Sequence, residues 1–298
     1  MDAPPWANPG LLPRQRNLPQ MGENESASSF KAISIKDLEK LETTFRPEQC
    51  IYEAPPAIRN LNRAAFTPRV ISIGPFHHCS KNLQPMEIQK NRYLKEFCKR
   101  LRGQTDEQVD KSLNELRRTI EDRKDAIKRR YADTYRNIKW DNDHQFVENI
   151  LLDAVFIFEL FLKTKEDSVN RTMYQYDFII GKPWLRAAIQ RDLILLENQL
   201  PFFILEELYN RATDYYRARY PPFLDLSCLY FENYGKIKTM PGETMQYEPL
   251  HFTDLVRYFL SFKHPKLASP GGKQCKPLHF NDVDLSSRQI CGLNVCLT

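Results

Sequence analysis

Residues 145–163, QFVENILLDAVFIFELFLK, decide the fold, because they form the most continuously apolar stretch of the chain. On a helical wheel at about 100° per residue, the polar side chains of this stretch fall within one arc of about 140°. They are Glu148, Asn149, Asp153, Glu159 and Lys163. We interpret this arc as the solvent-facing edge of a deeply packed helix, with Glu159 and Lys163 forming an i,i+4 pair. A pair of catalytic carboxylates is the alternative interpretation.

Helical patterns extend outward from this stretch in both directions. Apolar residues recur at helical spacing in residues 33–42, 86–101, 106–132, 223–231 and 251–262. A further helix should run from the aromatic stretch MYQYDFIIGKPWL, residues 173–185, toward residue 193. The pattern predicts a mainly α fold, a multi-helix globular bundle. We expect a flexible leader at 1–30, a single helical domain at 31–263 and a poorly structured tail at 264–298.

One region interrupts the helical patterns. Residues 50–79 contain four prolines, which exclude a long helix there. The run Val70–Ile73 is rich in β-branched residues and is followed by Gly74 and Pro75, so we expect it to form a short strand. The region is thus predicted to be an irregular segment with one or two short strands.

A second unusual stretch is LILLENQLPFF, residues 193–203, which has three polar residues inside an apolar run. If a helix continued through it, Glu197 and Asn198 would point into the apolar side. Pro201 predicts a kink or break around Glu197–Leu200, because proline cannot donate a backbone hydrogen bond. Glu197, Asn198 and Gln199 would then bond the freed backbone groups. A ligand-binding or catalytic role for Glu197 is the alternative.

Composition limits the class of protein. The net charge of +5 is too small to predict nucleic-acid binding on its own, and the one dense basic cluster, KRRYADTYR (128–136), leaves nucleic acid or anionic lipid only as an alternative there. Seven cysteines without a C-x-x-C pair favour reduced thiols, and the N-terminus lacks the features of a secretory signal. No apolar run is long enough to span a membrane. We therefore expect this form of the chain to be cytoplasmic.

Motifs that carry chemistry are few. The sequence contains no P-loop, G-x-G-x-x-G, G-x-S-x-G or H-E-x-x-H motif, so we assign no catalytic or cofactor-binding residue and expect no cofactor. His77, His78 and Cys79 are weak candidates for metal binding, because adjacent residues rarely serve one tetrahedral ion. A Cys79–His78 nucleophile is a further alternative. An enzyme or metal-dependent protein that uses this cluster and Glu197 is the second hypothesis.

Four stretches of the chain are distinctive when taken together and in this order: CIYEAPPAIRNLNRAAFTPRVISIGPFHH (50–78), MEIQKNRYLKEF (86–97), FVENILLDAVFIFELF (146–161) and RDLILLENQLPFFILEELY (191–209). They closely resemble a known plant family, domain of unknown function 247. The resemblance covers residues 50 to about 262 and implies a flowering-plant protein of mainly helical fold. The family has no established catalytic residues. Some of its grass members are associated with pollen self-incompatibility, which implies a non-enzymatic role in recognition or signalling, with an unknown protein partner.

The end of the chain departs from the family pattern. Members usually continue past this region and finish with a membrane-spanning segment, so full-length relatives are expected to be membrane-anchored. The present chain resembles a truncated or alternatively spliced member.

Overall fold

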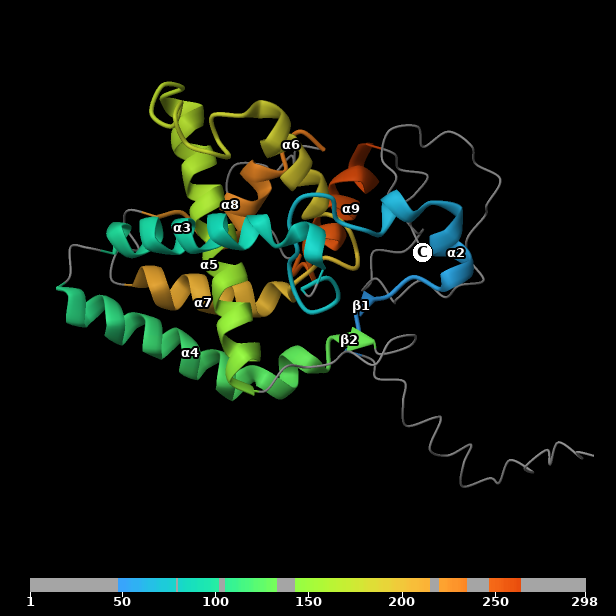
Figure 1. Ribbon diagram of the computed structural model, residues 1–298, viewed down its shortest axis with the longest axis horizontal. Coiled ribbons are helices and arrows are strands. Elements are labelled where there is room, and N and C mark those ends of the chain that lie inside the picture. The colour runs from blue at the N-terminus through green and yellow to red at the C-terminus, as the bar shows by residue number, and fades with distance from the viewer. Residues whose placement is uncertain are drawn as a thin grey trace, which may run out of the picture. The chain divides into compact units, whose positions relative to one another are not determined.

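Helix α5, Asp143–Val169, runs through the middle of the helices in the computed structural model of the protein, as Figure 1 shows. The structure describes residues 48–78, 80–101, 105–132, 143–214, 220–234 and 247–263. Helices α3, α4, α7 and α8 all pack against α5. Because α5 has neighbours all around, fifteen of its residues are buried, including its run Asp153–Lys163.

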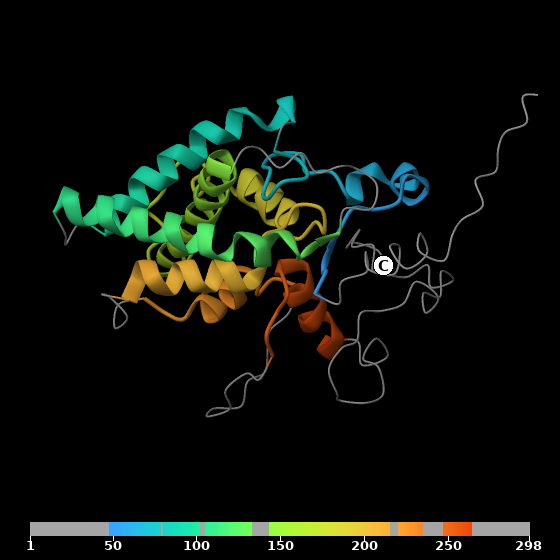
Figure 2. The same cartoon turned by 90° about the horizontal axis from the view of Figure 1, so that it is seen from below.

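Seven further α-helices are described around α5. Before α5 come α2 (Pro56–Leu61), α3 (Pro85–Arg100) and α4 (Asp106–Lys128), and after it α6 (Pro183–Asp192), α7 (Phe202–Thr213), α8 (Phe223–Tyr230) and α9 (Phe252–Lys263). Helices α4 and α7 lie side by side, as Figures 1 and 2 both show. The prediction of a mainly α multi-helix fold is confirmed.

Local sequence explains where the long helices begin. Helix α4 starts with a capping box, in which Thr105 and Gln108 each bond the other's backbone N–H. Helix α3 has Pro85 at its first position, where the missing N–H costs no hydrogen bond. Short 3-10 turns also occur, at Arg63–Ala65 and Lys81–Leu83.

Aromatic rings fill the core between α5, α8 and α9. The Phe161 ring of α5 lies 4.0 Å from the Tyr230 ring and 5.5 Å from the Phe252 ring, measured between centroids. Phe158, one turn earlier, contacts Tyr209 and Phe223 edge-on. Such pairs stabilise a core by about 0.5–1.5 kcal/mol each beyond the burial of their area.

The polar residues of α5 correct the prediction of a solvent-facing edge. Asp153, Glu159 and Lys163 are all buried. Lys90 of α3 donates to Asp153 at 2.6 Å, and Arg100 of α3 donates to Glu159 at 2.6 Å. Asp153 and Glu159 therefore face α3, which supplies a cation for each of them, whereas the half-buried Glu148 pairs with Arg117 of α4. Burial raises the pKa of Glu159 to about 7, against the opposing effect of Arg100.

The irregular region contains less strand and more helix than predicted. Its strand β1, Ile51–Tyr52, pairs in parallel with β2, Tyr131–Ala132. Val70–Ile73 is not a strand, so that prediction is wrong. The short helix α2 was not expected between the prolines, although proline at the first position of a helix is well tolerated.

Several sequence predictions fall outside the described residues. They are the leader at 1–30, the helix at 33–42 and the tail at 264–298. Within the described ranges, no helix is both long enough and apolar enough to cross a membrane.

Candidate functional site

The stretch 193–203 is a turn between two helices rather than a kink within one. Helix α6 ends at Asp192, and α7 begins at Phe202. Pro201 has φ −57° and ψ 135°, an extended conformation that starts α7 without continuing α6. The chain therefore breaks before Glu197, earlier than the sequence predicts. The three polar residues lie in this buried turn.

Asn198 takes the place of a neighbouring β-strand for the segment Ile71–Ile73. Its Oδ1 accepts from the Ile73 N–H at 2.7 Å, and its Nδ2 donates to the Ile71 carbonyl at 3.0 Å. A strand partner would bond the same two groups through a peptide unit. Nδ2 also donates to the carbonyl of Asp192 at 2.9 Å, at the end of α6. The backbone groups of the β-rich run are therefore bonded although the run does not belong to a sheet.

Asp192 supports the same segment from its other end. Its Oδ2 accepts from the backbone N–H groups of Arg69, Val70 and Ile71, at 2.9, 2.6 and 3.1 Å. Burial raises the pKa of this carboxyl, and the three N–H groups oppose that shift. This role has no signal in the sequence, because the three N–H groups that Asp192 bonds lie more than 120 residues away along the chain.

Gln199 connects the turn to the start of α9. Its Nε2 donates to the carbonyls of Leu193 and Leu195, and the Leu195 carbonyl also accepts from the Asn198 N–H. Its Oε1 accepts from the Phe252 N–H at 3.0 Å, at the first position of α9. The side chain thus satisfies groups of two separate elements.

Glu197 anchors the segment around α2. Its Oε1 accepts from the Ala54 N–H at 2.8 Å and from Arg59 of α2 at 2.8 Å. The same guanidinium nitrogen of Arg59 also contacts Glu53 at 2.9 Å. Helix α2 has no buried residue of its own, so its attachment depends on Arg59 and on the small apolar cluster beside it.

The histidine and cysteine candidates are only partly placed. Nε2 of His77 lies 3.3 Å from Oε2 of Glu197, but neither atom has hydrogen-bond geometry. Nδ1 of His78 is buried without a hydrogen bond. Cys79 lies outside the described residues. Among the residues that the structure describes, no group of three or more side chains is arranged to hold a metal ion.

Gly74 lies against the same turn, and the half-buried Pro75 follows it. Gly74 has φ +73°, which favours glycine, and a Cβ at this position would lie 2.4 Å from the backbone oxygen of Gln199. The Gly74 N–H also donates to Asp153 of α5 at 2.9 Å. Only glycine allows this close approach of the two backbones.

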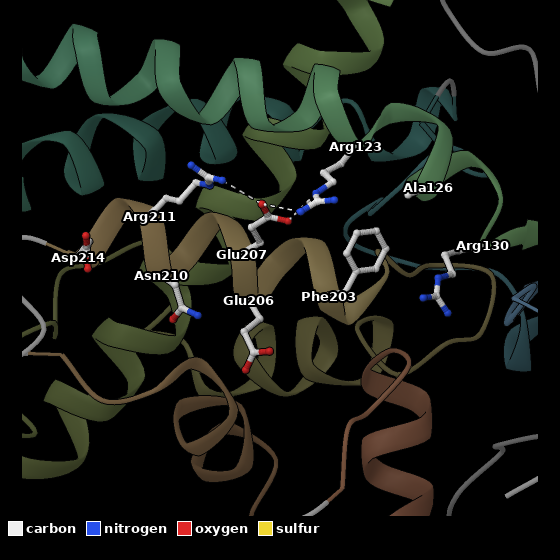
Figure 3. A pocket seen from close by; sticks show the side chains of 9 residues that line it. All are labelled: Arg123, Ala126, Arg130, Phe203, Glu206, Glu207, Asn210, Arg211 and Asp214. Atoms are coloured by element: carbon white, nitrogen blue, oxygen red, sulfur yellow. Dashed lines mark hydrogen bonds and ion pairs between the residues drawn. The ribbon is translucent and has the colours of Figure 1, made fainter. Parts of the chain in front are cut away.

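A surface hollow of about 700 Å³ lies between α4 and α7 (Figure 3). At its wall, Glu207 forms ion pairs with Arg123 and Arg211. Arg130 lies over the Phe203 ring at 5.3 Å. Three arginines and three carboxylates line the hollow, the other two carboxylates being Glu206 and Asp214, so it carries no concentrated charge of either sign.

Large apolar side chains are exposed in the connection between α5 and α6, seen after the upper end of α5 in Figure 1. We call residues 169–184 the aromatic loop. Tyr176 is 92% exposed and Trp184 69% exposed, and three more large apolar residues of the loop are exposed: Val169, Met173 and Phe178. Among the described residues, five of the nine exposed large apolar side chains therefore lie in this one stretch.

Hydrogen bonds and buried side chains fix the backbone of the aromatic loop. Asp177 accepts from the Tyr93 hydroxyl at 2.8 Å, from Lys163 at 2.7 Å and from two backbone N–H groups of its own loop. Ile179 and Ile180 are buried in the core. The loop thus presents its exposed rings from a fixed backbone, although only its ends are helical: Val169 closes α5, and Trp184 lies in the first turn of α6.

Comparison with known proteins places the chain among plant sequences. It is 36% identical over 171 residues to the UPF0481 protein At3g47200 of Arabidopsis thaliana. That alignment covers 57% of this chain and 33% of the relative, so the chain spans about a third of the relative's length. No solved structure matches. Residues 51–285 match the family DUF247, described as plant protein of unknown function, and the chain therefore belongs to that family.

Proposed function

We propose that this chain is a non-enzymatic recognition or signalling protein that binds a protein partner through the aromatic loop. The observation that carries the proposal is the exposure of Tyr176 and Trp184 on a loop whose backbone is fixed. Tyr, Trp, Phe, Met and Arg are the residues enriched in the centres of protein interfaces, and Tyr, Trp and Arg supply most hot spots.

Rigidity strengthens this interpretation. A flexible loop would lose conformational entropy on binding, whereas a fixed one has already lost it during folding. The bonds of Asp177 and the burial of Ile179 and Ile180 fix the backbone on both sides of Phe178. The exposed rings can therefore bind a partner at little entropic cost.

The buried turn at residues 193–201, which we call the polar turn, supports the proposal in a second way. The hydrogen bonds of Asn198 and Gln199 go to backbone groups of the protein itself. These two buried side chains therefore stabilise the fold, and a partner would have to bind elsewhere, at the surface.

Proximity labelling in pollen and vegetative plant cells tests the proposal. The double variant Tyr176→Ser/Trp184→Ser should lose the neighbours that the wild-type protein labels. The matched control is Leu61→Ser/Ile88→Ser, which changes two exposed apolar residues on α2 and α3. If both variants label the same neighbours as the wild type, the aromatic loop is not the binding surface.

A second hypothesis is a metal-dependent or enzymatic role for His77, His78 and Cys79 together with Glu197. The observation in its favour is the 3.3 Å contact between His77 and Glu197. Metal analysis of the purified protein tests it. Stoichiometric zinc that is lost in His78→Ala would support this hypothesis and contradict the first one.

A further inference from the structure

We infer that the partner segment bound by the aromatic loop is acidic, with apolar side chains between its carboxylates. The inference rests on the proposed function and specifies the chemistry of the partner. It follows from how the charges around the loop are balanced within the protein.

The carboxylates near the loop are already paired. Glu166 forms an ion pair with Arg100, Asp167 with Arg186, and Asp177 with Lys163. Charges neutralised in this way contribute little attraction to a partner. The stretch 165–186 contains no other carboxylate.

Three cations of the same stretch have no such partner. Within the ranges that the structure describes, Lys165, Arg171 and Lys182 form no ion pair with a carboxylate. The Lys182 ammonium instead lies 3.8 Å from the centre of the Phe178 ring. The charge therefore sits directly beside one of the exposed rings. A partner that covers the Phe178 ring must also meet the Lys182 charge, and the exposed Arg171 adds a second cation to the same stretch of chain.

Polar residues of the loop favour a peptide over a lipid surface. Gln175 and Thr172 are exposed between the apolar side chains. Thr172 bonds Asn170 within the loop, and an amide such as that of Gln175 can bond the backbone of a peptide. Hydrocarbon would leave such groups unbonded, at a cost in free energy. A protein segment with acidic and apolar side chains can pack against the rings, pair with the cations and bond the amide at the same time.

Selection from a phage-displayed library of random peptides tests the inference with the purified full chain as target. The wild-type protein should select peptides enriched in Asp and Glu next to Leu, Phe or Trp. The variant Arg171→Glu/Lys182→Glu should lose the acidic enrichment, and the dissociation constant of a selected acidic peptide should rise about tenfold. The control is Lys111→Glu/Arg118→Glu, two exposed cations on α4, which should select the same acidic peptides.

The outcomes separate this inference from the proposed function. If the selected peptides depend on Tyr176 and Trp184 but show no acidic enrichment, the aromatic loop is a binding surface and the inference about charge is wrong. If no selected peptide depends on Tyr176 and Trp184, both are wrong. Sedimentation with vesicles of phosphatidylcholine and phosphatidylserine provides a further arm. Vesicle binding that Arg171→Glu/Lys182→Glu abolishes, without any selected peptide, would assign the surface to anionic lipid and overturn the inference.

Discussion

Replacing Asn198 with leucine should greatly destabilise the fold while changing the size of the side chain little. Asn198 is fully buried and bonds Ile73 N–H, Ile71 C=O and Asp192 C=O. The Asp192 carbonyl keeps a bond from the Leu195 N–H, so two backbone groups lose their partner. At about 1–3 kcal/mol for each buried unbonded group, the free energy of unfolding should fall by about 2–6 kcal/mol.

Urea unfolding followed by circular dichroism measures this loss. The matched control is Asn210→Leu, an exposed position on α7 where a substitution should change stability by less than about 0.5 kcal/mol. If the slope of the unfolding free energy against urea concentration is unchanged, the variant exposes the same surface on unfolding and differs only in stability. If Asn198→Leu costs no more than Asn210→Leu, Asn198 does not replace a strand for residues 71–73.

Three more changes have clear expected outcomes in the same assay. Gly74→Ala should cost more than about 2 kcal/mol, because φ is +73° and the new Cβ meets the Gln199 backbone oxygen; a smaller loss would show that the two backbones can separate. Lys90→Met should cost about 3–5 kcal/mol by leaving Asp153 buried without its cation, whereas Lys99→Met, in an exposed pair, should cost less than about 1 kcal/mol. Burial lowers the pKa of His251 from 6.5 to about 4, so the unfolded chain binds more protons between these values and stability falls as the pH drops below 6.5. In His251→Asn, the asparagine can still accept from the Asp254 N–H. The variant should lose about 2 kcal/mol less stability than the wild type between about pH 7 and pH 5. An unchanged pH dependence would show that His251 is not its cause.

The longer helices could be predicted from the sequence because each has its own apolar period, whereas α2, which has no buried residue, could not. The partners of polar residues could not, because a helical wheel does not distinguish an arc that faces water from one that faces another helix. Asp153 and Lys90 are separated by 63 residues, and only the packing of α3 against α5 brings them together. For this reason the sequence predicts a solvent-facing edge where the structure has buried ion pairs.

The polar turn shows a similar limit. Polar residues beside Pro201 predict a chain break with side chains bonding to backbone, and the carbonyls of Leu193 and Leu195 are bonded in this way. The sequence does not identify the remote groups, such as Ile73 N–H, since they depend on the tertiary fold.

The exposure of Tyr176 also has no signal in the local sequence, because the stretch 173–185 is as apolar as a core segment.

The extent of the family match differs from the expectation as well. The match continues to residue 285, whereas the resemblance in the sequence is expected to end near residue 262.

The bonds of the polar turn also set an order of events during synthesis. Ile73 is 125 residues from Asn198, and Ala54 is 143 residues from Glu197. At about 5–20 residues per second, the ribosome needs roughly 6–30 s to make the chain between these partners. During that interval the segment around residues 50–78 has emerged without the side chains that hold it. It is therefore the part of the chain that a chaperone would have longest to bind before the fold closes.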